Sequence, residues 1–300
     1  MTIREALRLA EARLEQAGVP DADVDAAYLL ASVLKEDTLA MRINGHRELA
    51  APQQAAFDAL CDRRAAREPL QYILGETEFM GLTFHVEPGV LIPRADTEIL
   101  VEKALAWMKP GARVLDIGTG SGAIAVSLAK LGRPAQVTAV DVSDRALEIA
   151  RQNAERNGAA VEFVKSDCFS ALKGRKYDMI VSNPPYISED EMRGLMPEVA
   201  REPELALFGG ADGLDFYRAI SEKWTAALAP GGRLYFEVGI GQADAVLRIM
   251  RSQGCLLFEI GWLQKDAVSA LVKAHIGEPF ALRDYGQNWR VVGAKKEGAC

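Results

Sequence analysis

Short apolar runs alternate with helical stretches through the last two thirds of this 300-residue chain. In the clearest unit, Val114–Ala123, an apolar run meets a glycine-rich turn and then the start of a helix. Strands that alternate with helices form a mostly parallel sheet with helices on both faces. Ligands bind such sheets beyond the carboxyl ends of the strands. Seven runs are predicted as strands: Arg113–Ile117, Val137–Val142, Val161–Lys165, Met179–Ser182, Arg233–Val238, Leu256–Gly261 and Trp289–Gly293.

The pattern before these runs divides the sequence into three parts. Residues 1–75 carry apolar stripes at helical spacing, and Thr2 and Glu5 have the spacing of a capping box. This part is predicted to be a small helical domain with a role in recognition. Residues 76–92 are predicted to form a β-hairpin linker, because apolar residues alternate there between glycines and a proline. Residues 93–300 make up the predicted α/β domain.

The composition excludes several classes of protein. Hydrophobic residues make up 49% of the chain and charged residues 26%, which indicates a folded globular protein. The sequence has no apolar run of membrane-helix length and no apolar leader, so no membrane association is expected. A net charge of −7 counts against general nucleic-acid binding. The four cysteines and three histidines are scattered, so we expect no metal site and a reducing, cytoplasmic location.

The turn Gly118-Thr119-Gly120-Ser121-Gly122 is typical of a site for an adenosine-bearing cofactor. Its glycines allow a sharp bend and a close approach of the backbone to a ligand. The spacing fits the G-x-G-x-G of S-adenosylmethionine sites and also the G-x-G-x-x-A of dinucleotide sites. Asp116 precedes the turn and is a supporting candidate. Asp141 lies at the end of the next strand and can accept hydrogen bonds from two ribose hydroxyls, which suits either cofactor.

Asp167 and Cys168 follow the third predicted strand, at the expected rim of the same cleft. Asp167 could accept a hydrogen bond from an adenine amino group, and Cys168 could pack on the adenine ring. A plain polar loop after a strand would explain the same residues.

The most specific motif is Asn183-Pro184-Pro185-Tyr186, directly after the strand Met179–Ser182. A planar NH₂ group is a poor nucleophile because its lone pair is delocalised. The Asn183 side-chain oxygen and the Pro184 carbonyl offer two acceptors for the two N–H bonds of such a group. They would hold the nitrogen toward a methyl donor and stabilise the positive charge that grows on it. Tyr186 offers a flat wall against a planar substrate.

Together these motifs resemble those of S-adenosylmethionine-dependent N-methyltransferases. More narrowly, the chain resembles the protein-(glutamine-N5) methyltransferases of peptide-chain release factors, the HemK/PrmC type. The resemblance is most specific in Ile92-Pro93-Arg94-Ala95-Asp96-Thr97-Glu98 followed by Asn183–Tyr186. It also includes Glu68–Gly75, Glu78–Leu82, Glu202-Pro203, Gly209–Leu214, Glu237–Gly239 with Gln242, and Arg283–Gly286 with Arg290.

The resemblance implies a class I methyltransferase fold. Such a fold has a Rossmann-like, seven-stranded, mostly parallel sheet, here with an N-terminal helical bundle and a β-hairpin linker. It implies S-adenosylmethionine as cofactor, no metal, and the glutamine of the Gly-Gly-Gln loop of class I release factors as substrate. In this sequence Gly118–Gly122 would line the methionine and ribose parts of the cofactor, and Asp141 would bind the ribose. Asn183 would bind the substrate amide and touch the cofactor, and Pro184, Pro185 and Tyr186 would complete the substrate clamp.

Other implied positions are less direct. Cys168 stands where many relatives place a bulkier residue against adenine, often Trp, which leaves its contribution open. Arg94, Asp96 and Thr97 are expected near the cleft as supporting residues. Helix capping and surface charge would also account for these three residues.

Three other functions fit part of the pattern. A nucleic-acid amino-methyltransferase for adenine N6 or guanine N2 would use the same Asn-Pro-Pro-Tyr clamp, but it predicts a basic surface. A binding protein without catalysis predicts loss of Asn183 or of a cofactor glycine, and all are present. A nicotinamide-dependent oxidoreductase would leave the Asn-Pro-Pro-Tyr turn unexplained.

Overall fold

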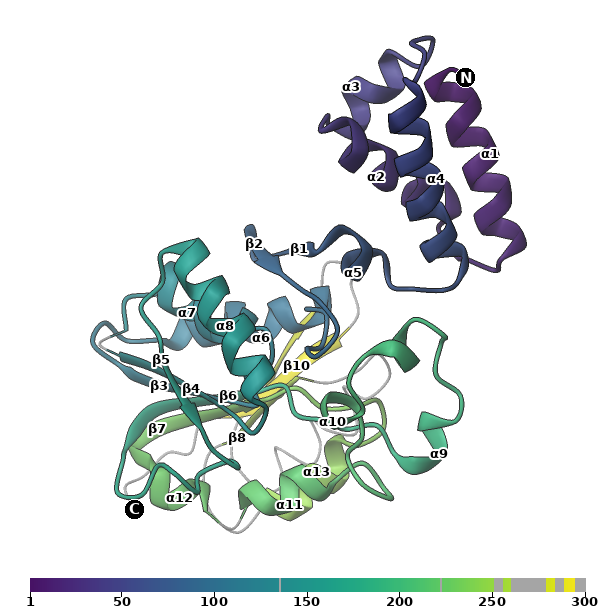
Figure 1. Ribbon diagram of the computed structural model, residues 1–300. Helices are drawn as coiled ribbons and strands as arrows, with labels where there is room; N and C mark the ends of the chain where they lie inside the picture. Colours follow the sequence, from purple (N-terminus) through teal and green to yellow (C-terminus); the bar gives the residue numbers. More distant parts are fainter. Residues whose placement is uncertain (135, 222, 251–255, 260–278, 284–288, 295–300) are drawn as a thin grey trace. The chain divides into compact units, whose positions relative to one another are not determined.

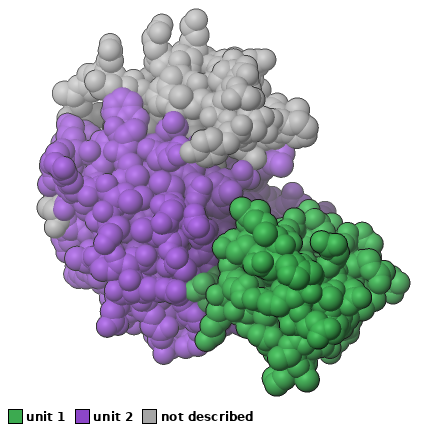
Figure 2. Space-filling view, turned by 90° about the horizontal axis from the view of Figure 1, so that it is seen from above, with its two compact units in different colours: residues 1–76, 196–201 green, residues 77–195, 202–300 purple. Residues whose placement is uncertain are grey.

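The computed structural model describes residues 1–134, 136–221, 223–250, 256–259, 279–283 and 289–294 (Figure 1). The chain forms two compact units, coloured separately in Figure 2. The first unit contains Met1–Glu76 and Met196–Arg201, and the second contains Thr77–Leu195 and the residues from Glu202 onward. Within the described residues, no helix combines the length and the apolar character needed to span a membrane.

The first unit is helical, and its N-terminal cap forms as predicted. Thr2 and Glu5 make the capping box, with Thr2 N–H donating to Glu5 at 2.8 Å and Glu5 N–H donating to Thr2 at 3.3 Å. The helices are α1 (Ile3–Gln16), α2 (Ala22–Leu34), α3 (Thr38–Ile43), α4 (Ala51–Ala65) and α5 (Leu70–Leu74). Their shared core includes Ile3, Leu14, Leu29, Leu30, Met41 and Phe57. The helical stripes of the sequence therefore mark packing faces.

A short segment from much later in the chain belongs to this helical unit. Glu198, just before the 3₁₀ turn Val199–Arg201, accepts from Arg67 at 2.6 and 2.7 Å and from Arg64 at 2.8 Å. Arg64 also donates to Asp25 at 2.6 Å, and its side chain is only 5% exposed. Burial would raise the pKa of Glu198, but hydrogen bonds from Arg67 and Arg64 hold it at about 2. Burial raises the pKa of Asp25 and outweighs the opposing effect of Arg64.

The second unit begins with a β-hairpin, as the sequence predicts. Strands β1 (Glu76–Phe79) and β2 (Leu82–His85) are joined by Met80 and Gly81, whose φ angles of 54° and 69° give the twist that two-residue hairpins need. The hairpin packs through Phe79 and Phe84, which are both buried. Their ring centroids lie 6.0 Å apart in an edge-to-face arrangement. Its segment is therefore an integral part of the second unit's core.

The main sheet has eight strands within the described residues, in the order β5-β4-β3-β6-β7-β8-β10-β9. The strands β3 to β8 run parallel, and β10 is antiparallel to both β8 and β9. The prediction of seven strands missed β9, which begins at a proline and lies at the sheet edge, where a missing N–H is tolerated. The bounds are β3 (Arg113–Ile117), β4 (Gln136–Asp141), β5 (Glu162–Lys165), β6 (Tyr177–Ser182), β7 (Leu228–Phe236), β8 (Leu256–Glu259), β9 (Pro279–Arg283) and β10 (Trp289–Ala294).

Helices cover both faces of this sheet (Figure 1). On one face, α6 (Ala95–Trp107), α7 (Ala123–Leu131) and α8 (Asp144–Asn157) pack on residues such as Val114 and Val181. On the other, α11 (Asp215–Ser221), α12 (Trp224–Ala227) and α13 (Ala243–Met250) pack on Leu115 and Ile180. Consecutive residues of one strand, such as Val114 and Leu115, therefore face the apolar cores on opposite sides of the sheet, because side chains alternate along a strand. Two short helices, α9 (Glu189–Met192) and α10 (Glu204–Leu207), follow β6.

The ion cluster of the helical unit, formed by Asp25, Arg64, Arg67 and Glu198, gives a stability prediction. Glu198→Gln should lower the free energy of unfolding of this unit by about 2–4 kcal/mol, because Arg64 and Arg67 then lose their shared carboxylate. Hydrogen exchange in α2 and α4 should become faster, as measured by mass spectrometry on the full chain. The folded-state pKa lies below the ordinary value, so the contribution is present above pH ~4.5 and is lost as the pH falls toward 2.

The matched control is Glu36→Gln, which removes the carboxylate from the exposed pair with Arg47. That change should cost less than about 1 kcal/mol. Equal exchange rates in the Glu198→Gln and Glu36→Gln variants would contradict a structural role for the cluster.

Candidate functional site

A cavity of about 250 Å³ lies at the carboxyl ends of four neighbouring strands, where the sequence predicts the ligand site. Ile117, Gly118 and Gly120 reach it from the end of β3, and Asp141 to Ser143 from the end of β4. Residues after β5 and β6 complete the sheet side. The remaining wall comes from Gly89–Leu91, Ala146, Phe216 and the segment 203–206 through Pro203, Leu205 and Ala206. Every one of these residues lies in the second unit.

The glycine-rich turn and Asp141 form one hydrogen-bonded unit. Asp141 Oδ2 accepts from Gly120 N–H at 2.9 Å, and Oδ1 accepts from Ser143 N–H at 2.9 Å. Ser143, rather than Asp141, caps α8 by accepting from Ala146 N–H. Gly122 has a φ of 83°, and a Cβ there would meet the Ala150 side chain at 3.0 Å, so the turn packs directly on α8. Two backbone donors therefore fix the Asp141 carboxylate beside the cavity.

Three other predicted residues of this motif lie behind the cavity wall. Asp116 is fully buried and accepts from the Thr119 hydroxyl at 2.6 Å, while its Oδ1 has no hydrogen-bond partner among the described residues. Burial raises the pKa of Asp116 to about 7. The Ser121 carbonyl accepts from the buried Asn153 side chain at 2.9 Å, and Asn153 also bonds the backbone of His85 in the hairpin. Thr119 and Ser121 thus shape the turn, and neither lines the cavity.

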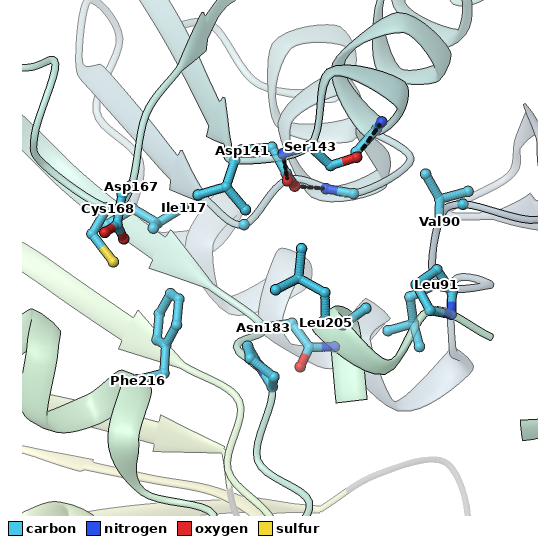
Figure 3. Close-up of a pocket in the computed structure, with 18 of the residues that line it drawn as sticks. Val90, Leu91, Ile117, Asp141, Ser143, Asp167, Cys168, Asn183, Leu205 and Phe216 are labelled. Carbon is cyan, nitrogen blue, oxygen red and sulfur yellow. Dashed lines mark hydrogen bonds between the residues drawn. The ribbon is translucent and has the colours of Figure 1, made fainter. Parts of the chain in front are cut away.

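Asp167 and Cys168 lie at one end of the cavity, with Phe216 near them (Figure 3). Cys168 has a φ of 45°, and burial raises the pKa of its thiol to about 12, which keeps it protonated. Asp141 and Ser143 lie across the cavity from Phe216 and Asn183, and Val90 and Leu91 close the other end (Figure 3). The sequence reasoning missed Phe216, which offers a flat aromatic face in this wall.

The Asn-Pro-Pro-Tyr turn reaches the cavity through Asn183 and Pro185. Asn183 Nδ2 donates to the Thr97 hydroxyl at 3.0 Å, and that hydroxyl donates to Glu237 at 2.6 Å. The Tyr186 hydroxyl contacts the other oxygen of Glu237 at 3.4 Å. Pro184 and Tyr186 do not line the cavity. The structure brings Thr97 to the Asn-Pro-Pro-Tyr turn, and it adds Glu237, whose segment entered the resemblance without an assigned role.

Arg94 has a different place from Thr97. It pairs with Glu202, which also accepts from Ile92 N–H at 2.9 Å. The Glu202 side chain is only 1% exposed. This contact fixes the chain immediately before Pro203, Leu205 and Ala206, which line the cavity. Arg94 thus supports the cavity wall from behind.

The charged lining of the cavity favours one of the two cofactor classes. Among the described lining residues, the charged ones are the carboxylates Asp141 and Asp167, and none is basic. Such a lining suits a ligand with hydroxyl groups and positive charge, and it offers no basic side chain to the two phosphates of a dinucleotide. S-adenosylmethionine carries a sulfonium, an ammonium and two ribose hydroxyls, so the residues fit it. Within the described residues, no group of three His, Cys, Asp or Glu side chains is placed to hold a metal ion.

Comparison with known proteins identifies the class and the family. The profile described as "Methyltransferase small domain" matches residues 82–202, and "PrmC N-terminal domain" matches residues 5–75. With its fold and cavity, the chain is a class I S-adenosylmethionine-dependent methyltransferase. A release factor glutamine methyltransferase of Geobacter sulfurreducens is 47% identical over 254 residues, which are 84% of this chain and 89% of the relative. The chain belongs to the release factor glutamine methyltransferase family.

One further relative and one solved structure are also similar to this chain. A release factor glutamine methyltransferase of Fusobacterium nucleatum is 40% identical over 289 residues, covering 94% of this chain and 76% of the relative. Among solved structures, the 16S rRNA N2 G1207 methyltransferase RsmC of T. thermophilus, in complex with AdoMet and guanosine, is 22% identical. That match has a TM-score of 0.47 and covers 74% of this chain and 50% of that chain.

One segment of the resemblance noted in the sequence, Arg283–Gly286, lies partly outside the described residues, which do not include 284–286.

The buried carboxyl of Asp116 predicts a pH dependence of stability. Its pKa is raised in the folded state, so the unfolded chain loses the proton first as the pH rises from about 4 to about 7. The free energy of unfolding should therefore fall across this window, and Asp116→Asn should abolish that part of the fall. Urea unfolding without cofactor at pH 5 and pH 8 measures it for both proteins. The variant should gain stability relative to the parent at pH 8; a difference that stays constant between the two pH values would contradict the prediction.

Proposed function

We propose that this protein transfers the methyl group of S-adenosylmethionine to the side-chain amide nitrogen (N5) of the glutamine in the Gly-Gly-Gln loop of class I peptide-chain release factors. The observation that carries the proposal is the position of Asn183. Its amide stands in the wall of the cofactor cavity, directly after β6, with its NH₂ engaged by Thr97. The oxygen of that amide is therefore available to a substrate N–H. Membership of the family supports glutamine as the substrate side chain.

The cavity residues suggest how the cofactor is held. The glycine-rich turn would lie along the methionine and ribose parts, and Asp141 would accept from the ribose hydroxyls with the lone pairs that its two backbone donors leave over. Asp167 would accept from the adenine amino group, and Phe216 and Cys168 would pack against the ring. When bound, S-adenosylmethionine supplies a methyl carbon activated by the adjacent sulfonium.

The protein's part in the transfer is to position and polarise a weak nucleophile. Asn183 Oδ1 would accept one N–H of the glutamine amide, and the Pro184 carbonyl, which has no partner within the described residues, would accept the other. Both acceptors stabilise the positive charge that grows on nitrogen. The alkylated nitrogen is acidic, so its proton can leave to water without a strongly basic side chain. Correct placement then supplies much of the rate.

Charge and location fit a protein substrate. The chain carries a net charge of −7, and the described cavity lining has no basic residue, so a nucleic-acid substrate gains little electrostatic attraction here. We place the reaction in the cytoplasm, where release factors act. The helical unit, whose profile match is separate from that of the methyltransferase part, would help to select the release factor.

The proposal is tested by incubating the protein with S-adenosylmethionine and a class I release factor, then mapping the product by tandem mass spectrometry. One methyl group on the Gly-Gly-Gln glutamine is expected. Asn183→Ala should lower the rate at least about 100-fold, because one acceptor on the nucleophile is gone, while cofactor binding remains measurable. Wild-type turnover by that variant would remove Asn183 from the mechanism. If the intact protein leaves the glutamine unmethylated, the proposed substrate is wrong, and DNA and ribosomal RNA are tested as substrates next.

The cofactor assignment makes a separate prediction. Asp141→Ala should weaken S-adenosylmethionine binding by about 10- to 100-fold, because charge-assisted hydrogen bonds to the ribose are lost. Calorimetry measures the dissociation constant. Asp178→Ala, which removes an acid paired with Arg113 outside the cavity lining, is the matched control and should leave it unchanged. An unchanged constant in Asp141→Ala would count against the ribose assignment.

A further inference from the structure

Thr97 connects the substrate clamp to a buried acid. Its hydroxyl oxygen lies 2.6 Å from Glu237 Oε2 and 3.0 Å from Asn183 Nδ2, and both Thr97 and Glu237 are buried. A threonine hydroxyl has one proton, and the Thr97 hydroxyl donates that proton to Glu237 Oε2. The Thr97 oxygen is then restricted to accepting a hydrogen bond from Asn183.

This restriction fixes which end of the Asn183 amide faces the cavity. If the amide were turned by 180°, Asn183 Oδ1 would meet the Thr97 oxygen with no proton between them. The NH₂ group therefore faces Thr97, and Oδ1 faces away from it. Asn183 Oδ1 has no hydrogen-bond partner in the described part of the chain, and the residue lines the cavity. An oxygen in this position binds an N–H of a substrate, whereas an NH₂ group there would oppose it.

We propose that Thr97, held by Glu237, is a positioning residue that selects the acceptor orientation of Asn183. The inference rests on the proposed function, because it explains how the clamp recognises an amide N–H. It assigns Thr97 no contact with the reacting atoms. Thr97 acts through Asn183, and Glu237 acts through Thr97.

The sheet brings this chain of hydrogen bonds together from distant parts of the sequence. Asn183 follows β6 and Glu237 follows β7, and these parallel strands are neighbours, with Glu237 N–H donating to Ser182 at 3.1 Å. The Tyr217 hydroxyl donates to the Glu237 carbonyl at 2.8 Å. Thr97 enters from the first turn of α6. Backbone contacts thus fix the acid, and the acid in turn fixes Thr97.

Glu237 also contacts the Tyr186 hydroxyl, so the carboxylate holds two members of the clamp. The backbone of Tyr186 is held separately, because Gln242 donates to its carbonyl at 2.7 Å and accepts from Gly239 N–H at 3.2 Å. A change at Thr97 therefore leaves this second attachment of the turn in place. That makes Thr97 the position at which the orientation of Asn183 can be tested by itself.

The test compares Thr97→Val, which removes the hydroxyl at nearly constant volume, with Thr97→Ser, which keeps it. Methylation of a class I release factor is measured as kcat and KM, and cofactor binding by calorimetry. Thr97→Val should lower kcat by about 10- to 100-fold and leave the S-adenosylmethionine dissociation constant within about twofold, because only the nucleophile is misplaced. Thr97→Ser should retain activity within about threefold. Thr97→Ala provides the same comparison if the valine variant fails to fold, as judged by circular dichroism.

A matched control and a double variant separate positioning from general damage. The control is Thr138→Val, which makes the same change at a fully buried threonine. The Thr138 hydroxyl also donates to a glutamate, Glu162, at 3.1 Å, but neither residue lines the cavity. This variant should keep full activity. In an Asn183→Ala background, Thr97→Val should cost less than about threefold more, since the group it positions is already gone.

The outcomes distinguish the two proposals. A parent protein that does not methylate the release factor overturns the proposed function itself. If the parent is active, wild-type kcat in Thr97→Val overturns the positioning role. An equal loss from Thr97→Val with and without Asn183 also overturns it, because the threonine would then act independently of the asparagine.

Discussion

Parallel strands that end at one edge of the sheet place every sheet-derived group of the site. The neighbouring strands β5, β4, β3 and β6 are each followed by a segment that lines the cavity, and β7 is followed by Glu237 directly behind it. Residues separated by up to 140 positions, such as Thr97 and Glu237, therefore meet through side chains. The strands themselves are fixed by two apolar cores on opposite faces, so the geometry of the site is set by packing elsewhere.

Three carboxylates in or behind the cavity wall are oriented by donors that belong to the protein. Asp141 accepts from two backbone N–H groups, Glu202 from Ile92 and Arg94, and Glu237 from Thr97. Buried acids cost free energy unless donors satisfy them, so these contacts define one arrangement of the loops. Asp116 differs from these three, because it is fully buried and one of its oxygens lacks a partner in the described residues, and burial raises its pKa.

The sequence was sufficient to predict the α/β sheet, the hairpin, the capping box and the cavity at the strand ends, since these follow from local periodicity and turn chemistry. It placed Asn183, Asp141 and Cys168 at the cavity for the same reason, because each lies at the end of a strand or within three residues after it. It could not place Val90, Leu205 or Phe216 there, because they come from segments whose position depends on long-range contacts. It also could not tell that Thr119 and Ser121 face away from the cavity, since a turn's side-chain directions depend on its exact backbone angles. The edge strand β9 was missed because its first residue is a proline.

The segment Ile92–Thr97 shows what a family-specific motif can encode without touching a ligand. Ile92 and Arg94 bind Glu202, which fixes the wall formed by Pro203 and Leu205, and Thr97 binds Glu237 and Asn183. Six consecutive residues thus join the wall of the cavity to the Asn-Pro-Pro-Tyr turn. The functional groups of Ile92, Arg94 and Thr97 explain how the segment makes these contacts. A backbone N–H and a guanidinium satisfy one buried acid, and a hydroxyl gives its proton to another while it accepts from an amide. A hydroxyl does both at once, which no aliphatic side chain of similar volume can do.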